Sequence, residues 1–434
     1  MTLFGIALVV GTTLFPALQL VGLPGITDQL ALFSQYLGLA SLILMAWGQI
    51  LSTRFAGMEA IFGGLDRVYV LHKWAGIAAM ATLLLHDTID ADMRNLGPEG
   101  PLNDLAETLG EISLYGLLIL VVISVATFIP YQLWKWTHKA MGALFAAGTF
   151  HFFFIMKPFA MGDPAGLYTG AFCAAGLLAY AWTLLPEALR SSVGYEIDLI
   201  EETGGALAVT LRPQGRVLKP APGQFGVVRF TGAGEREPHP FTFSRIGEDG
   251  RLRVSVKALG DFTRRLPERL AEGQDVRIHG PYGRFRMPRS GPQVWIAGGI
   301  GVTPFLTWID ALSPDAGPVD LFYCARSRDE APHLAELEAR AAALPNLTLH
   351  LVFSRVGPRL TADLLAERSG VDLAQAKVFF CGPTPLREAL RLGLSPHGVA
   401  PRAFHYEEFE FRTGIGLRKL AGWIARRRQA PQPT

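Results

Sequence analysis

Six stretches of this sequence are each long and apolar enough to cross a lipid bilayer, and they confine residues 1–190 to a bundle of membrane helices. A helix needs about 20 mostly apolar residues to span the hydrocarbon core. The stretches are residues 3–23, 30–52, 67–87, 110–130, 137–157 and 165–185. The first has no basic flank and no small-residue cleavage pattern, so we interpret it as a span and not as a signal peptide.

Charges between the spans predict the orientation of the bundle. Basic residues follow the second and fourth spans (Arg54, Arg67, Lys135 and Lys139). The long connection after the third span is acidic (Asp90, Asp92, Glu99, Asp104 and Glu107). Cytoplasmic loops carry an excess of Lys and Arg. We therefore expect a multi-pass protein of the inner (plasma) membrane, with both termini and the whole C-terminal half in the cytoplasm. Lys157 is an exception to this charge distribution, because it lies at the outer end of the fifth span.

Two of the spans contain pairs of histidines. The third span contains His72 and His86. The fifth contains His138 and His151. Ionisable side chains are costly inside a bilayer and indicate a function. Neutral imidazole binds iron, and haem sites in bundles use side chains from facing helices. We predict two b-type haems about 20 Å apart, each between one histidine of each span. Four interfacial histidines bonded to loops are the alternative.

The spacing of the second pair is unequal to that of the first. Fourteen residues return a helix to within about 40° of its starting face, whereas the thirteen between His138 and His151 leave about 140°. Either the fifth span departs from regular helical geometry, or its two imidazoles approach their haems from different sides.

Composition changes after residue 190, where the sequence becomes that of a soluble protein. Over the whole chain 18% of residues are charged, a low share that reflects the apolar spans. A formal net charge of +2 gives no reason to expect nucleic acid as a partner. Cys173, Cys324 and Cys381 form neither a disulfide framework nor a zinc-ligand spacing, which suits a reducing compartment.

Short alternating segments predict an antiparallel β-barrel over residues 194–288. The candidate strands are YEIDLI, ALAVTL, QFGVVRF, PFTFSRI, LRVSVKA and DVRIHG. From Gln293 the strands QVWIA, VDLFYCA, LTLHLVF and KVFFC alternate with helical segments, which predicts a doubly wound α/β domain over residues 289–412. The remaining residues, 413–434, contain GLRKLAGWIARRR. This basic amphipathic tail is either solvated or a helix on the inner membrane surface.

A glycine-rich turn after the first α/β strand is the candidate dinucleotide site. Glycines let the backbone approach a pyrophosphate, and a helix N-terminus favours its negative charge. Proline suits the first helical turn. The residues are Gly298, Gly299, Gly301, Thr303 and Pro304. An ordinary turn is the alternative interpretation.

Three further segments are candidates for a flavin site. The strand HPFTFS offers an aromatic ring and a hydroxyl to a flavin (His239, Pro240, Phe241, Thr242 and Ser244). LGDFTRRL places Gly260, Phe262 and Thr263 at a second helix start. FHYEEFEF offers Phe409 as a ring that covers the flavin, with Glu407 two residues earlier. For each segment an ordinary amphipathic strand, helix start or edge strand is the alternative.

The order of these segments resembles a known family. A barrel with HPFTFS, then GGIGVTP, then Cys381-Gly382-Pro383, then a terminal aromatic strand is similar to the ferredoxin–NADP reductase family. Behind six spans with paired histidines, the chain resembles bacterial NADPH oxidases and ferric reductases from about residue 30 to 412.

This resemblance implies roles for individual residues. The four histidines ligate two haems, with the same unequal spacing, and His239, Pro240, Phe241 and Thr242 line FAD. The glycine loop with Thr303 receives the dinucleotide. Cys381, Gly382 and Glu407 lie near the nicotinamide, and Phe409 shields the isoalloxazine ring and moves aside for hydride transfer. Thr242, Cys381, Glu407 and Phe409 are thus the candidate catalytic residues.

The resemblance also implies a preference for NADPH. Ser354-Arg355 matches a pair that binds the 2′-phosphate, and a guanidinium suits a phosphate. A solvated loop arginine is the alternative, and NADH the alternative donor. The tail after Arg412 departs from the family pattern and puts the freedom of Phe409 in doubt.

The resemblance therefore implies electron transfer from cytosolic NADPH through FAD and two b-type haems to an external acceptor. O₂, giving superoxide, is the first choice, and a ferric or cupric chelate is the second. A quinone or a periplasmic partner protein is the third. A haem-binding sensor or a channel without turnover is the alternative from another class, and the dinucleotide loop and flavin strand argue against it.

Overall fold

A computed structural model of the chain gives the fold. It describes residues 2–21, 23, 28–55, 57–89, 99–125, 129, 131–185, 192–232, 237–258 and 260–407. The chain divides into two compact units, one within Met1–Leu185 and the other Pro186–Phe409. The predicted tail, 413–434, lies outside the described residues.

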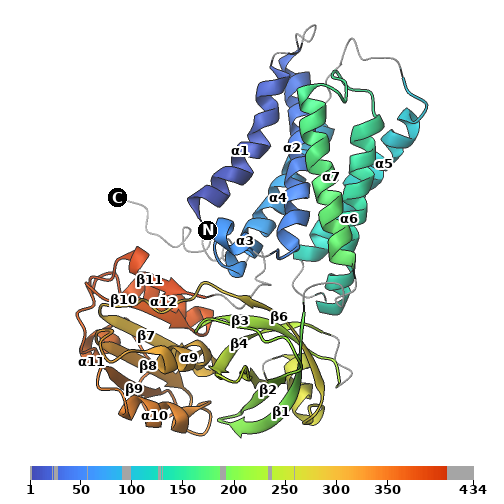
Figure 1. Ribbon diagram of the computed structural model, residues 1–434. Helices are drawn as coiled ribbons and strands as arrows, with labels where there is room; N and C mark the ends of the chain where they lie inside the picture. The colour runs from blue at the N-terminus through green and yellow to red at the C-terminus, as the bar shows by residue number, and fades with distance from the viewer. Residues whose placement is uncertain are drawn as a thin grey trace, which may run out of the picture. The chain divides into compact units, whose positions relative to one another are not determined.

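The first unit is a bundle of long helices (Figure 1). The helices are α1 (Leu3–Leu20), α2 (Gln29–Ser52), the short α3 (Met58–Phe62), α4 (Leu65–Thr88), α5 (Asn103–Val125), α6 (Tyr131–Phe154) and α7 (Pro164–Leu184). α2 contacts α1, α4, α6 and α7 and is the most buried of the long helices. It therefore forms the centre of the bundle.

Five helices among the described residues are long and apolar enough to cross a membrane, namely α1, α2, α4, α5 and α7. The membrane character of the N-terminal part is therefore confirmed. α6 is as long as α4, with 24 residues, but it is not among the five. It carries Lys135 and Lys139 as well as two histidines, which lower its hydropathy. A sixth span stays a prediction.

The start of α5 differs from the prediction. The helix begins at Asn103, so Asp104 and Glu107 lie in its first turns and not in the loop to which the sequence analysis assigned them. Acidic residues are favourable near a helix N-terminus, where backbone N–H groups are unpaired. Asn103 is buried, and its amide donates to the carboxylate of Glu107 (3.1 Å). Asp90 and Asp92 lie outside the described residues.

The second unit contains the predicted antiparallel barrel, which closes with the strand order β1-β2-β5-β4-β3-β6. Its strands are β1 (Val193–Thr203), β2 (Ala206–Pro213), β3 (Phe225–Phe230), β4 (His239–Ile246), β5 (Leu252–Lys257) and β6 (Asp275–Tyr282). Alternate side chains, among them Tyr195, Phe230 and Phe243, fill the barrel. The short helix α8 (Asp261–Arg265) and a 3-10 turn (Leu266–Glu268) connect β5 to β6.

The same unit contains a parallel sheet with the order β11-β10-β7-β8-β9. Its strands are β7 (Gln293–Gly298), β8 (Val319–Ala325), β9 (Leu347–Phe353), β10 (Lys377–Cys381) and β11 (Phe404–Tyr406). Its helices are α9 (Thr303–Ala311), α10 (Leu334–Ala342), α11 (Ala362–Arg368) and α12 (Thr384–Gly393), with 3-10 turns at Gly299–Val302 and Pro401–Ala403. The order reverses between β7 and β10, and ligands of doubly wound sheets bind at the carboxyl ends of the strands at such a point.

Candidate functional site

The four predicted metal ligands lie on two helices, two on α4 and two on α6. α4 packs chiefly against α2, and α6 chiefly against α5. α6 is a continuous α-helix from His138 to His151. Of the two explanations for the unequal spacing, a break in the helix is therefore excluded, and different directions of approach remain.

Backbone carbonyls of α2 orient the imidazoles of α4. The Nδ1 of His72 lies 2.9 Å from the carbonyl oxygen of Gly48. The Nδ1 of His86 lies 2.8 Å from the carbonyl oxygen of Ser34 and 3.0 Å from its hydroxyl. A carbonyl can only accept, so Nδ1 carries the proton and Nε2 keeps the lone pair that binds a metal.

α5 orients the imidazoles of α6 in the same way. The Nδ1 of His151 lies 2.9 Å from the carbonyl oxygen of Ala106. The Nδ1 of His138 lies 3.2 Å from the hydroxyl of Ser124, which can donate or accept. Histidines that bind metals almost always use the other ring nitrogen in this way, because the bond fixes the ring and raises its basicity. His72, His86 and His151 therefore have the surroundings of a metal ligand, and His138 has them when the hydroxyl of Ser124 accepts.

His72 and His138 approach each other across the bundle, with ring centroids 5.9 Å apart. Two imidazoles on one metal ion hold their nitrogens roughly 4 Å apart, at about 2 Å from the metal each. The ring centres lie beyond the nitrogens, so the observed separation is compatible with one shared ion. Among the described residues no group of three or more His, Cys, Asp or Glu is arranged to hold a metal. Two histidines suffice for haem, because the porphyrin supplies the equatorial nitrogens.

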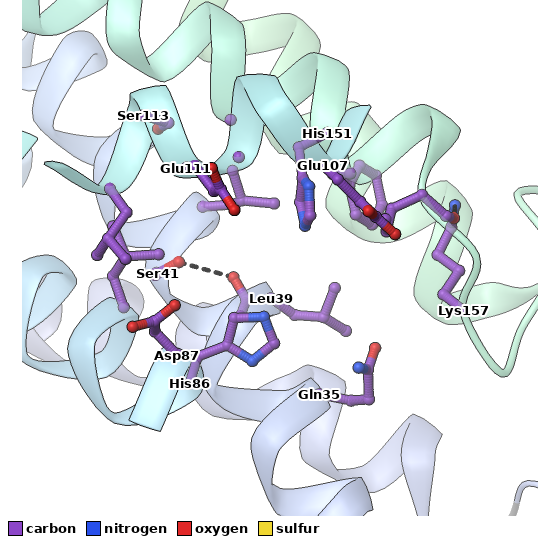
Figure 2. Close-up of a pocket in the computed structure, with 18 of the residues that line it drawn as sticks. Gln35, Leu39, Ser41, His86, Asp87, Glu107, Glu111, Ser113, His151 and Lys157 are labelled. Carbon is purple, nitrogen blue, oxygen red and sulfur yellow. Dashed lines mark hydrogen bonds between the residues drawn. The ribbon is translucent and has the colours of Figure 1, made fainter. Parts of the chain in front are cut away.

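His86 and His151 line a cavity of about 400 Å³ within the first unit. Figure 2 shows the two rings entering the space from opposite sides. This volume lies in the range of cofactor sites, which are mostly apolar with a few polar groups. The apolar lining includes Leu39, Leu42, Met45, Leu83, Leu114 and Phe152.

Glycines on the neighbouring helices make room for these two rings. A Cβ on Gly38 of α2 would lie 3.1 Å from the Nε2 of His86. A Cβ on Gly110 of α5 would lie 2.5 Å from the Nδ1 of His151. Each imidazole therefore lies against bare backbone. Neither glycine was predicted to belong to the site, although small residues facing another helix are a signal of close packing in membrane bundles.

Charged side chains also line the cavity, on more than one side of it (Figure 2). They are Asp87 at the end of α4, Glu107 and Glu111 of α5, and Lys157 just after α6. The ammonium group of Lys157 also donates to two carbonyl oxygens at the end of α6 (3.2 and 3.4 Å). The lining of the cavity thus combines apolar and charged side chains.

In the second unit, the loops after β7 and β10 meet at the point where the strand order reverses. A Cβ on Gly301 would lie 2.2 Å from the carbonyl oxygen of Cys381. One on Gly298 would lie 2.6 Å from the Cδ of Pro383, and Gly382 packs against Gly298 in turn. Gly299 has a φ of +56°, which favours glycine. The glycines therefore serve loop–loop contact as well, a role that the sequence analysis did not identify.

The helix after the glycine loop begins as predicted. α9 starts at Thr303 with Pro304 in its first turn. The hydroxyl of Thr303 is buried and donates to the carbonyl oxygen of Ile300 (3.1 Å). This bond fixes the turn that presents the helix N-terminus at the sheet edge.

Cys381 and Glu407 are both buried and interact electrostatically. Burial raises the pKa of the Cys381 thiol well above its usual value, and the nearby Glu407 carboxylate raises it further. The thiol is therefore neutral near pH 7. Phe409 lies outside the described residues.

The predicted flavin strand is β4, which contacts α9. Phe243 packs into the barrel core, so Thr242 and Ser244 lie on the opposite face of the strand. Thr242 pairs with Phe225 of β3. Ser244 is fully buried, and its hydroxyl bonds to neighbouring barrel residues. Pro240 and Phe241 are partly buried on the same strand.

The two predicted flavin segments come together through ring stacking. The His239 ring stacks on Phe262 of α8 with centroids 3.8 Å apart. At the start of α8, the backbone N–H of Gly260 donates to the hydroxyl of Thr263 (3.0 Å). The structure therefore joins the HPFTFS strand to the LGDFTRRL segment.

Ser354 and Arg355 follow β9, at the same sheet edge as the glycine loop. The backbone N–H groups of both residues bond to the end of β8 and its loop (3.0 Å each). The Arg355 guanidinium forms an ion pair with Glu330 (2.7 Å), with the two side chains 60% and 32% exposed. Glu330 was not predicted as a partner of Arg355, although the acidic pair Asp329-Glu330 shortly after β8 is a signal for it.

Three consecutive parts of the chain match known families. Residues 37–149 match "Ferric reductase like transmembrane component". Residues 197–294 match an FAD-binding domain, and residues 295–391 match an oxidoreductase NAD-binding domain. Together these matches form the architecture of ferric reductase-like and NADPH oxidase-type proteins.

Curated relatives resemble part of the chain. The ferredoxin–NAD(P)(+) reductase component of the naphthalene 1,2-dioxygenase/salicylate 5-hydroxylase systems of Ralstonia sp. is 29% identical over 209 residues, 46% of this chain and 62% of its own length. A flavohemoprotein of Bordetella pertussis is 29% identical over 210 residues, 43% of this chain and 52% of its own. The chain thus spans less than two thirds of these relatives.

Among solved structures, a flavohemoglobin from Malassezia yamatoensis with bound FAD and haem has a TM-score of 0.49 and 18% identity. The similarity covers 88% of this chain and 96% of that one.

Proposed function

With a ferric reductase-like transmembrane component joined to ferredoxin–NADP reductase-type FAD and NAD domains as the premise, we propose that the protein is a transmembrane oxidoreductase. It carries electrons from NADPH on the cytoplasmic side, through FAD and two b-type haems, to an external acceptor. O₂ is our first choice of acceptor, with superoxide as product. The observation that carries the proposal is the set of four histidines whose Nδ1 atoms are held by α2 and α5.

In the membrane, His72 with His138 would hold the inner haem, and His86 with His151 the outer one. The residues fit this group: the rings of His72 and His138 lie close together, and those of His86 and His151 enter one cavity from opposite sides (Figure 2). Because two histidines would hold each haem, the acceptor would not need to bind the iron. The bundle itself excludes water and fixes the spacing of the ligands.

When bound, FAD takes a hydride from NAD(P)H and passes electrons on singly, and haem carries one electron at a time. The protein contributes binding and orientation. On β4 and α8, His239, Pro240, Phe241, Thr242, Gly260, Phe262 and Thr263 would line the flavin. Ser244 was predicted to contact the flavin too, but its hydroxyl is bonded to residues of the barrel. At the sheet edge the dinucleotide would be held by Gly298, Gly299, Gly301, Thr303, Pro304, Gly382 and Pro383.

Cys381, Glu407 and Phe409 would complete the hydride-transfer site. The neutral thiol of Cys381 would add no negative charge beside the nicotinamide ring. Glu407 interacts with this thiol and would lie near the same ring. Phe409 would cover the flavin and move aside. Ser354 and Arg355 would bind the 2′-phosphate of NADPH, with Glu330 as the present partner of Arg355.

A ferric or cupric chelate is the second candidate acceptor. The carboxylates of Asp87, Glu107 and Glu111 line the cavity that we assign to the outer haem, and they favour a cationic acceptor. Lys157 in the same lining opposes this. A quinone or a periplasmic partner is the third candidate. The basic connections favour the plasma membrane, with residues 190–412 in the cytoplasm.

Anaerobic spectroscopy tests the proposal. Purified full-length protein given NADPH should develop the absorption bands of reduced b-type haem, and the bands should disappear when O₂ is admitted. A haem-binding sensor or a channel would show no NADPH-dependent bands. Absence of haem from protein expressed with ample haem would refute the proposal.

A second experiment separates the acceptors. NADPH oxidation is measured with O₂, with a ferric chelate and with a quinone as the sole acceptor, and superoxide is scored by a dismutase-sensitive dye. Turnover with the chelate but not with O₂ would replace our first choice.

A further inference from the structure

We propose that a largely buried network centred on Glu336 positions the flavin strand β4 against the nucleotide-binding helix α9 for hydride transfer. The inference rests on the proposed function, since it assigns flavin contact to β4 and dinucleotide contact to the loop before α9. None of the residues of the network belongs to the site derived above, except Ser244, whose predicted role in flavin binding it replaces.

On the barrel side, the network begins at Arg253 of β5. The side chain is buried, and its Nε donates to the hydroxyl of Ser244 on β4 (3.1 Å). Its Nη2 donates to both carboxylate oxygens of Glu336 (2.8 and 3.1 Å). One guanidinium therefore connects the flavin strand to α10 of the nucleotide-binding domain.

A second connection runs through two serines and a histidine. The hydroxyl of Ser255 lies 2.9 Å from that of Ser244 and 2.7 Å from the Nε2 of His333. The Nδ1 of His333 lies 3.2 Å from a carboxylate oxygen of Glu336. A carboxylate can only accept, so Nδ1 donates, and both ring nitrogens of His333 are engaged.

From Glu336 the network continues to α9. Arg340, one turn further along α10, pairs with Glu336. Its Nη1 also donates to the carbonyl oxygen of Leu306 (3.1 Å) and pairs with Asp310. Leu306 lies three residues after Thr303, which begins α9. The network thus extends from a position two residues after Thr242 to the first turn of the helix that follows the glycine loop.

The backbone around His333 is held in an uncommon conformation by the barrel. His333 has a φ of +58°, in the left-handed region that non-glycine residues rarely adopt. Its N–H donates to the hydroxyl of Thr203 at the end of β1 (2.7 Å). The next residue of that turn, Gly204, touches the loop before His333, since a Cβ there would lie 2.3 Å from the carbonyl carbon of Ala331. Such strain persists where the surroundings fix it and often marks a functional constraint.

The charges of the network persist at physiological pH. Burial alone would raise the pKa of Glu336, but the hydrogen bond from His333 and the charges of Arg253 and Arg340 lower it to about 2. Glu336 therefore remains ionised throughout the physiological range. Across the domain contact Glu336 bonds to Arg253 of β5, so sliding of one domain against the other would leave the buried guanidinium of Arg253 and the partly buried carboxylate of Glu336 without their partners.

Rapid-reaction kinetics on the full-length holoprotein tests this role. We expect Glu336→Gln to lower the limiting rate of FAD reduction at saturating NADPH by about tenfold or more, since small misplacements of reacting groups carry such costs. The dissociation constant for NADPH and the FAD content should change by less than about twofold. Ser255→Ala is a gentler variant that removes one hydroxyl and should show a smaller loss of the same kind.

Glu338→Gln is the matched control. Glu338 lies on α10 two residues after Glu336, and its ion pair with Arg328 (2.8 Å) stays within the nucleotide-binding domain and is more exposed. It should reduce FAD at the wild-type rate. A wild-type limiting rate in both Glu336→Gln and Ser255→Ala would overturn the inference. So would a loss that merely followed FAD content or melting temperature. Failure of NADPH to reduce FAD in the wild-type protein would instead refute the proposed function.

Discussion

The two units of this protein build their candidate sites from different parts of the chain. In the membrane unit, side chains are the proposed ligands, and the backbone of neighbouring helices holds them: the carbonyls of Gly48, Ser34 and Ala106 accept from three of the four imidazoles. In the second unit, the backbone forms the candidate binding surface at the glycine loop, and distant side chains hold it through Glu336 and Arg340.

The cause of this difference lies in the hydrogen bonding of the backbone. Within an α-helix each N–H group is already paired, so a helix can offer a ligand only side chains and the spare lone pairs of carbonyls. At the ends of parallel strands the pairing stops and N–H groups become available to an anion. Substitutions should therefore act through lost ligands in the first unit and through backbone displacement in the second.

The largest effect should come from removing a ligand. We expect His86→Ala to abolish electron transfer to the external acceptor and to remove about half of the reduced haem absorbance, while NADPH still reduces FAD. Spectra and acceptor assays on one preparation measure both. The control is Thr82→Ala on the same helix, whose hydroxyl bonds within α4 (2.9 Å). Wild-type acceptor reduction in His86→Ala would contradict the assignment of the outer haem.

A Cβ at the glycine loop should have the next largest effect. Gly301→Ala would place a carbon 2.2 Å from a backbone carbonyl that cannot rotate away. Overpacking costs about 1–3 kcal/mol, and the rigidity of this contact favours the upper end. The melting temperature should fall, and the Michaelis constant for NADPH should rise. Gly357→Ala, whose nearest neighbour would lie 3.7 Å away, is the control. Unchanged melting would show that the two loops can separate without cost.

The equivalent change in the membrane unit should be milder. Gly110→Ala would bring a carbon within 2.5 Å of the His151 ring, which unlike a backbone carbonyl can swing. We expect haem affinity at the outer site to fall by roughly 10–100-fold, as when outer partners of metal ligands are changed. Haem content after dilution measures it. Gly76→Ala, with nothing within 4 Å, is the control. If Gly110→Ala lowered the melting temperature more than Gly301→Ala does, the expected order of the two substitutions would be wrong.

Removing the serine hydroxyl beside a histidine shows whether a side chain or a backbone carbonyl holds that imidazole. In Ser124→Ala, His138 loses its Nδ1 partner, so haem retention at the inner site should fall by about tenfold. In Ser34→Ala, His86 keeps the carbonyl bond of 2.8 Å, so the outer haem should change little. Equal effects of the two substitutions would indicate that the carbonyls contribute nothing.

The smallest effect is expected at the exposed nucleotide edge. Arg355→Ala should raise the Michaelis constant for NADPH several-fold and leave that for NADH nearly unchanged. Glu330→Gln should lower the constant for NADPH slightly, because an exposed ion pair contributes only about 0–1 kcal/mol. Steady-state kinetics with both donors measures this, and equal changes for NADPH and NADH would remove the phosphate role of Arg355.

Much of the fold could be predicted from the sequence, because its signals are local. Short segments of alternating apolar and polar residues, bounded by glycines and prolines, predicted all six barrel strands. Long apolar runs predicted the long helices. The start of α5 was missed because Asp104 and Glu107 look like loop residues until a helix N-terminus uses their charge. β11 has only three residues, which are too few to show the alternation that would have predicted where the strand ends.

The candidate site was predictable where it consists of unusual residue types. Histidines in apolar spans and glycines after a strand stand out by themselves. Ser34, Gly110 and Glu330 do not, since their roles depend on which helix or loop lies opposite. Tertiary contacts between distant segments decide these roles, and a single sequence does not contain the pairing.

The orienting bonds of the four histidines divide the membrane bundle into two hairpin-like halves. α2 with α4 forms one half and α5 with α6 the other, and each pair packs closely on its own. Apolar clusters already join these halves, among them one that contains Met80 of α4 and Leu114 of α5. A porphyrin ligated from both halves would add part of its binding free energy to the assembly of the bundle. Chains made without haem would then keep the two halves together through apolar packing alone.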